Sequence, residues 1–127
     1  MLLLDSHVLL WVLTGRRSLG PSAAKAIQAA AAVYVSAATV WELTIKAMLG
    51  KVRLPDRFAD QLEEQGLASL DVTAQHAAGI QAFPELALHD PFDRLLLAQA
   101  TIERLRLLTA DRVLLALDRP FIVDARA

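Results

Sequence analysis

Short apolar runs alternate with longer helical patterns along this chain of 127 residues, and this alternation constrains the fold most strongly. The runs expected to form strands are 2–4, 33–36, 68–70, 107–109 and 121–123. The segments expected to form helices are 6–14, 20–32, 37–49, 54–66, 73–83, 91–106 and 111–117. Strands that alternate with helices are typical of α/β folds with a mainly parallel sheet. Since the strands are continuously apolar, we expect a short central sheet with helices on both faces, a three-layer arrangement.

The length of the chain is that of one domain, and we expect residues 1–127 to form it because no repeat, linker or low-complexity tract interrupts the pattern. Hydrophobic residues make up 55% of the chain, with a mean hydropathy of +0.40. A core of this size does not cover so much apolar surface, which indicates self-association or a protein partner. The absence of cysteine excludes disulfides and thiolate metal sites.

The N-terminal segment "MLLLDSHVLLWVL" lacks the basic leader of a secretion signal, and Asp5 and His7 interrupt its apolar run. No apolar stretch approaches the roughly 18 residues of a membrane helix. We therefore expect a cytoplasmic protein with no membrane segment. Thirteen basic and fourteen acidic residues give a net charge of −1. This balance offers no global electrostatic footprint for nucleic acid.

Three acidic residues follow expected strands, where the carboxyl ends of parallel strands collect at one sheet edge. Asp5 comes directly after 2–4, and Asp111 lies two residues after 107–109. Glu42 lies on the second turn of the helix that follows 33–36. Asp93 lies in the first turn of the long helix and joins the others if that turn lies at the same edge.

Each acid also has a purely structural interpretation. Asp5 and Asp111 suit the N-cap position of the helices they precede, and Asp93 suits the positive end of a helix dipole. Glu42 can pair with Lys46 one turn later. For any one of these residues alone, the structural interpretation is favoured.

That interpretation is weakest for Glu42. We expect its neighbours Trp41, Ile45 and Met48 to mark the buried stripe of the helix, which places Glu42 at the margin of that stripe. A carboxylate there needs a compensating cation or a raised pKa.

Several carboxylates that converge on one point repel one another, and a divalent metal ion is the usual reason for such an arrangement. Oxygen ligands alone favour a hard ion, Mg²⁺ or Mn²⁺. Such an ion supports hydrolysis of a phosphodiester. Arg94 and Arg112 each follow a candidate acid and are candidates for contact with substrate phosphates, although both also fit as ordinary surface arginines.

Four segments, "LLLDSHVLLW", "SAATVWELTIKAMLGKVRLP", "HDPFDRLLLAQA" and "LLTADRVL", resemble in order and spacing the PIN-domain ribonucleases, specifically the VapC-type toxins of type II toxin–antitoxin pairs. The resemblance covers nearly the whole chain and implies a PIN-like α/β fold. It implies that the motif acids are Asp5, Glu42, Asp93 and Asp111. In that family the acids bind Mg²⁺ or Mn²⁺ and activate water to cut single-stranded RNA.

The resemblance also assigns the residues around the acids. Asp93 corresponds to a metal ligand, whereas Asp90 fits the N-cap of the long helix and a supporting position beside the ligands. Ser6 and Thr109 stand next to motif acids and are candidates to orient them.

A protein partner follows from the same family. The resemblance implies a small VapB-like antitoxin whose C-terminal segment lies across the active-site groove, and it implies a homodimer or a toxin–antitoxin hetero-oligomer. We expect antitoxin contacts on the helices at 37–49 and 56–65, although their apolar stripes also fit core packing.

Other residues and other families are less favoured. His7, His76 and His89 lack metal-ligand spacing and are expected in core, cap or surface roles, and Trp11 and Trp41 are expected in the core or an interface. A response-regulator receiver would need a lysine near the end of the last strand, but no lysine occurs after Lys51. A haloacid-dehalogenase-like phosphatase would need an aspartate two residues after Asp5, but position 7 is His7. A glycine-rich dinucleotide turn is also missing. A catalytically silent interaction module, with the acids serving only as caps, remains the non-enzyme alternative.

Overall fold

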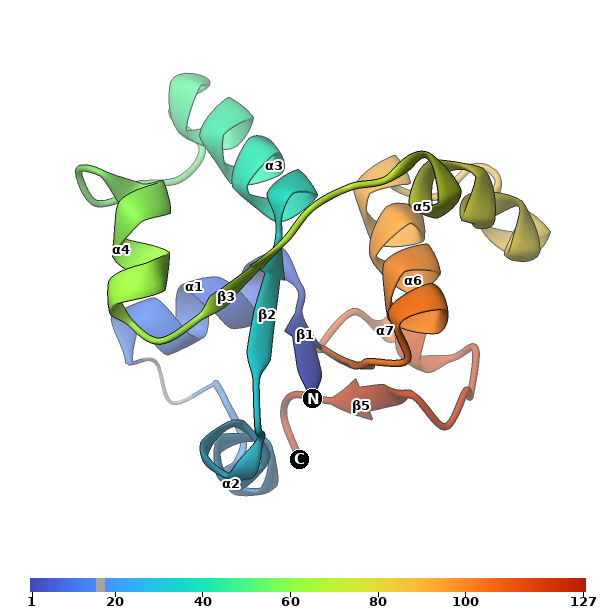
Figure 1. Cartoon of the computed structure of the whole chain (residues 1–127), viewed down its shortest axis with the longest axis horizontal. Helices are drawn as coiled ribbons and strands as arrows, with labels where there is room; N and C mark the ends of the chain where they lie inside the picture. Colours follow the sequence, from blue (N-terminus) through green and yellow to red (C-terminus); the bar gives the residue numbers. More distant parts are fainter. Residues whose placement is uncertain (16–17) are drawn as a thin grey trace.

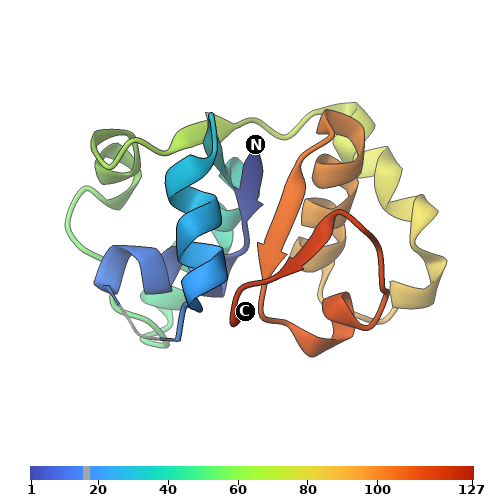
Figure 2. The same cartoon turned by 90° about the horizontal axis from the view of Figure 1, so that it is seen from below.

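The computed structural model describes residues 1–15 and 18–127 and contains one parallel sheet between two groups of helices (Figures 1 and 2). The strands are β1 (Leu2–Leu4), β2 (Val33–Ser36), β3 (Ala68–Leu70), β4 (Arg106–Thr109) and β5 (Ile122–Asp124). The sheet order is β3-β2-β1-β4-β5, and every pairing is parallel. This arrangement confirms the α/β class with a short parallel sheet.

The helices alternate with these strands as the sequence pattern predicts. They are α1 (Ser6–Thr14), α2 (Pro21–Ala29), α3 (Ala37–Met48), α4 (Phe58–Glu64), α5 (Ala74–Gly79), α6 (Pro91–Glu103) and α7 (Arg112–Leu115). Two short 3₁₀ helices, η1 (Ile80–Ala82) and η2 (Pro84–Leu86), connect α5 to α6. No helix in the described part of the chain has both the length and the apolarity needed to cross a membrane.

The sheet separates two apolar cores. Leu2 and Leu4 of the central strand β1 belong to one core, together with side chains from α1 to α4. Leu3 points to the other core, which contains Leu97 of α6 and Leu114 of α7. Because successive side chains of a strand alternate between the two faces, a strand buried on both faces must be apolar throughout. This is why the run at 2–4 has no polar residue.

Six of the seven predicted helices are shorter in the structure than in the sequence pattern, and α6 and α4 illustrate the difference. The helix expected at 91–106 ends at Glu103, where Arg104 takes a left-handed conformation with φ of 56° and its N–H binds the carbonyl of Ala100. Arg106 then already belongs to β4. The helix expected from residue 54 begins only at Phe58. In both cases the apolar periodicity extends beyond the residue at which the helix begins or ends.

The long helix α6 depends on its buried leucines for its position on the sheet. We predict that Leu97→Ala lowers the free energy of unfolding by about 2–5 kcal/mol, because Leu97 is fully buried and the smaller side chain leaves a cavity. Leu88→Ala makes the same chemical change at a fully exposed position and is the matched control. Urea unfolding of both variants measures the difference. Equal stability losses would contradict this placement of α6.

Candidate active site

Asp5 lies at the carboxyl end of β1 and caps α1. One carboxylate oxygen accepts a hydrogen bond from the backbone N–H of Val8 at 2.9 Å, and the other accepts from the hydroxyl of Thr109. The side chain is almost completely buried, and this burial raises the pKa of Asp5 above its ordinary value of 3.8. The Thr109 and Val8 hydrogen bonds oppose the rise in pKa, whereas the nearby Asp111 adds to it. The N-cap role is therefore real, and it places a buried acid at the sheet edge.

Asp111 occupies the equivalent place after β4. Its Oδ1 accepts hydrogen bonds from the backbone N–H groups of Val113 and Leu114, at 2.8 and 3.3 Å, and so caps α7. The backbone N–H of Asp111 donates to the hydroxyl of Thr109 at 3.0 Å. Thr109 thus links the two acids, since the same hydroxyl donates to Asp5. The capping bonds fix Oδ1 of Asp111, and Oδ2 faces the neighbouring helix α6.

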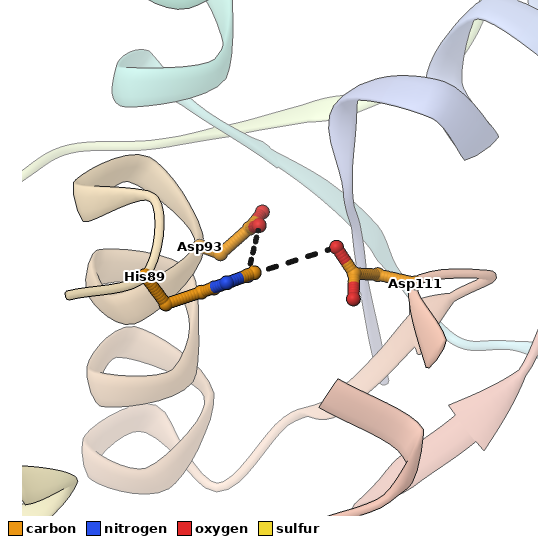
Figure 3. A group of neighbouring side chains, drawn as sticks. All are labelled: His89, Asp93 and Asp111. Carbon is orange, nitrogen blue, oxygen red and sulfur yellow. Dashed lines mark hydrogen bonds and ion pairs between the residues drawn. The ribbon is translucent and has the colours of Figure 1, made fainter. Parts of the chain in front are cut away.

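Asp93 meets Asp111 across the sheet edge through His89, as Figure 3 shows. Nε2 of His89 lies 3.0 Å from Oδ2 of Asp93 and 3.7 Å from Oδ2 of Asp111. All three side chains are partly buried, and each offers a ligand atom within 4.8 Å of the others. Among the described residues, these three form the group in which at least three potential ligand atoms all lie within 4.8 Å of one another.

The electrostatic environment of Asp93 is strongly unfavourable for a carboxylate. Burial raises the pKa of Asp93 from 3.8 to about 7, and the charges of Asp90, Asp111 and Asp5 add to the rise, whereas His89 opposes it. Asp5, Asp93 and Asp111 are therefore close enough to repel one another. A cation near them would relieve this repulsion.

The sequence expectation placed His89 in a core, cap or surface role, whereas the structure places its imidazole beside Asp93 and Asp111. The backbone N–H of His89 binds the carbonyl of Leu86, at the end of η2, and this turn returns the imidazole to the first turn of α6. The available signal is the spacing: His89 precedes Asp93 by four residues, one helical turn. A search for His–His spacing does not detect a mixed His–Asp pair. His89 also adds a nitrogen to a donor set that the sequence indicated to be all oxygen.

Glu42 joins the site through a lysine. Its Oε2 lies 2.9 Å from Nζ of Lys46, one turn later on α3. The Glu42 hydrogen bond raises the pKa of Lys46, burial opposes the rise, and the charges of Glu42, Asp90 and Asp93 add to it. Lys46 therefore lies between Glu42 and the acids of α6. Glu42 stands outside the close group of His89, Asp93 and Asp111.

The buried face of α3 differs from the predicted one. Glu42 is 5% exposed and shares the buried face with Leu43, whereas Trp41 is 62% exposed and Met48 82%. Ile45 is also exposed. The prediction assumed that the largest apolar residues mark the core. In this helix they mark a surface instead, and the buried carboxylate needs its lysine partner all the more.

Contacts between α3 and α6 hold the two halves of the site together. The rings of Trp41 and Phe92 meet edge to face with centroids 5.2 Å apart. Phe92 stands next to Asp93 in the first turn of α6, and Asp90 caps that helix by accepting from the N–H of Phe92 at 2.8 Å. The predicted cap role of Asp90 is confirmed. Trp41 lies at an exposed helix–helix contact rather than in the core.

The remaining candidates surround this site. Ser6 is buried in the first turn of α1, directly after Asp5. Arg94 is half-buried next to Asp93, and its Nε has no hydrogen-bond partner among the described residues. Arg112 is exposed on α7. His76 is buried in a capping box with Thr73, which confirms its expected cap and core role.

Comparison with known proteins agrees with this geometry. A family model described as PIN domain matches residues 2–120. The chain is 32% identical over 112 residues to Ribonuclease VapC22 from Mycobacterium tuberculosis (strain ATCC 25618 / H37Rv), a match that covers 87% of this chain and 86% of the relative. The chain belongs to the PIN domain family. Within that family, the relative places it with the VapC-type proteins, as the resemblance of its motifs implied.

Two solved VapBC complexes and a solved toxin–antitoxin complex have a similar fold. The chain is similar to VapBC2 from Rickettsia felis bound to a DNA fragment from their promoter (TM-score 0.66, 15% identity, 96% of this chain and 95% of that chain). It is also similar to DNA-bound VapBC from Salmonella typhimurium (TM-score 0.64, 23% identity, 98% and 97%). A toxin–antitoxin complex from Klebsiella pneumoniae gives a TM-score of 0.62 at 19% identity, with 87% of each chain covered. At these identities the similarity shows the PIN fold.

The raised pKa of Asp93 predicts an unusual pH dependence of stability in EDTA. In the unfolded chain Asp93 ionises near its ordinary value of 3.8, but in the folded protein it holds its proton up to about pH 7. The folded state binds more protons in this window, so the free energy of unfolding decreases as the pH rises from about 4 to about 7. Asp5 adds to the same trend. Urea unfolding at several pH values measures the slope.

Asp93→Asn is the matched comparison because asparagine has no proton to lose. We expect a flatter pH dependence for this variant, and a Tm above that of the wild type in EDTA at neutral pH. Parallel curves for the two proteins would contradict the repulsion assigned to Asp93.

Proposed function

We propose that this PIN domain is a metal-dependent endoribonuclease that hydrolyses phosphodiester bonds of single-stranded RNA and acts as the toxin of a toxin–antitoxin pair. The observation that carries the proposal is the convergence of Asp5, Asp93 and Asp111, with the pKa of Asp93 raised to about 7. The name Ribonuclease VapC22 of the relative supports the same reaction. We also propose residues 1–127 as one domain, because both cores pack on one sheet.

The donor set suits a hard divalent cation. Asp5, Asp93, Asp111 and Glu42 would hold Mg²⁺, with Mn²⁺ able to substitute, and among the described residues His89 offers a ring nitrogen within reach of Asp93 and Asp111. When bound, such an ion supplies positive charge for the phosphate and lowers the pKa of a water molecule.

The chain's own residues hold the carboxylates in place for this chemistry. Thr109 fixes Asp5 through its hydroxyl, and the first backbone N–H groups of α7 fix one oxygen of Asp111. Preorganised groups of this kind need no rearrangement when the reaction occurs. Ser6 and Asp90 remain predicted supports for the acids. Arg94 and Arg112 remain predicted contacts for substrate phosphates.

RNA cleavage provides the direct test. We expect the wild type to cut single-stranded RNA with Mn²⁺ or Mg²⁺ and to lose this activity in EDTA. Asp93→Asn should reduce the cleavage rate by at least about 100-fold. Loss of a residue that only supports a metal ligand already costs up to about 100-fold, and Asp93 is a proposed ligand itself. Asp60→Asn makes the same change on the exposed face of α4 and should leave cleavage unchanged. Cleavage that continues both in EDTA and in the Asp93→Asn variant would exclude the metal-dependent mechanism.

The non-enzyme alternative is an interaction module in which the acids serve only as caps. A thermal-shift series separates the two functions, because only an acid cluster that binds a cation gains stability as Mn²⁺ is added. No change in Tm at millimolar Mn²⁺ would favour the interaction module.

We propose a small VapB-like antitoxin as the partner. The solved proteins of the same fold are toxin–antitoxin and VapBC complexes, and α3 of this chain exposes Trp41, Ile45, Met48 and Leu49. Exposed apolar side chains on one helix are typical of a surface that a partner covers. The same surface is compatible with the proposed homodimer.

A co-purification experiment tests the partner. Where a reading frame next to that of this chain encodes a small protein, the two are expressed together, and we expect a stable complex that does not cleave RNA. Met48→Glu should weaken this complex by at least about tenfold, because it places a charge on the apolar surface. Val72→Glu, a similar change at an exposed position in the loop between β3 and α5, is the control. If Met48→Glu does not weaken the complex, the partner does not bind at α3.

A further inference from the structure

A groove that contains basic residues and no acidic ones begins beside the acid cluster. Two adjoining hollows, of about 280 and 460 Å³, share His7, Leu10, Lys51 and Val52 in their walls. The smaller hollow reaches Ser6 and Lys46, and the larger continues to Trp11 and Arg53. We call this continuous depression the basic groove. Its volume is in the range of sites that hold nucleotide-sized groups.

The groove opens at the proposed active site. Ser6 directly follows Asp5, and Lys46 pairs with Glu42 at 2.9 Å. The groove then runs between α1 and the loop that follows α3. Helices α1 and α3 leave the neighbouring strands β1 and β2 at the same end of the sheet (Figure 1). A chain that has one phosphate at the acids can therefore continue into the groove without leaving the protein surface.

The backbone geometry after α3 holds the cations of the groove in place. Gly50 has a φ of 74°, its N–H binds the carbonyl of Ala47, and the N–H of Lys51 binds the carbonyl of Lys46 at 2.8 Å. This is a Schellman motif, in which a left-handed residue turns the chain back over the last helical turn. The turn brings Lys51 next to the end of the helix that carries Lys46 and Glu42.

The charge of the groove differs from that of the whole chain. Lys46, Lys51 and Arg53 contribute positive charge, and no aspartate or glutamate is among the described residues that line either hollow. Among residues 1–15 and 18–127, neither Lys51 nor Arg53 forms an ion pair with a carboxylate. Both side chains are exposed. In a chain with fourteen acidic residues and a net charge of −1, this local excess of unpaired cations indicates an anionic ligand.

We propose that the basic groove binds the single-stranded RNA that flanks the cleavage point, with Lys51 and Arg53 contacting its phosphates. This inference rests on the proposed function, since it concerns the substrate of that site. The guanidinium of Arg126 lies 5.3 Å from the centre of the Trp11 ring, so the unpaired cations and their place beside the acids, rather than ring stacking, carry the assignment to RNA. An acidic protein segment would use the same cations, and the polyglutamate probe distinguishes it from RNA.

Binding in the absence of cleavage tests the groove. Fluorescence anisotropy of a labelled 20-nucleotide oligouridylate is measured in EDTA with the full-length protein. Lys51→Ala and Arg53→Ala should each weaken binding about three- to tenfold, and each should reduce the slope of log affinity against log salt by about 0.7. Lys51→Arg should bind like the wild type because it keeps the charge. Both positions are exposed, so the Tm should not change.

The control is Lys25→Ala, an exposed lysine on α2 at the opposite end of β2 from α3 (Figure 1). Wild-type RNA affinity in Lys51→Ala and Arg53→Ala would overturn the proposal, as would a loss equal to that of Lys25→Ala. Polyglutamate is the second probe: a loss of polyglutamate binding with unchanged RNA binding would assign the groove to an acidic protein segment instead.

The outcomes separate this inference from the proposed function. If the wild type does not cleave RNA but its binding depends on Lys51 and Arg53, the groove stands and the nuclease proposal fails. If the wild type cleaves RNA and the two variants bind and cleave normally, the nuclease proposal stands and the groove fails.

Discussion

Repulsion among buried carboxylates is the constraint on which this site depends. Parallel topology brings the acids after β1 and β4 to one edge, and the start of α6 adds Asp93. The protein does not relieve this repulsion fully with its own side chains: the His89 ring lies between Asp93 and Asp111, and Lys46 pairs with Glu42. A folded state that keeps like charges together loses stability, and functional sites are where such losses persist.

Helix capping explains how the carboxylates can be held without being neutralised. Asp5, Asp90 and Asp111 are all N-caps, so the structural interpretation of each was correct. A cap uses backbone N–H groups, which carry no net charge and occupy only part of a carboxylate's acceptor capacity. The same bonds therefore build the helices and orient the acids. The structural and functional interpretations of an acid at this edge are not alternatives.

The fold could be predicted from the sequence because each strand is a short apolar run and each helix has a periodic pattern. The prediction failed where one residue decides the geometry, as at Arg104, whose left-handed backbone ends α6 early. It also failed where size was taken as a sign of burial. Trp41 and Met48 are large and apolar but exposed. The prediction failed for them because residue type alone does not distinguish an exposed apolar surface from a core. His89 was missed since its role depends on a turn at Leu86 that periodicity does not report.

Net charge was a poor guide to the ligand for a physical reason. The value of −1 sums thirteen basic and fourteen acidic residues over the whole chain, so it does not report that an acidic cluster and a basic groove lie side by side. Interactions between exposed charges fade beyond about 8 Å at physiological salt, so a bound phosphate responds to the cations beside it rather than to the total. In the proposed function, separating the charges in this way would let the RNA approach its cleavage site from the basic side. A uniformly basic surface would instead have neutralised the acids that the chemistry requires.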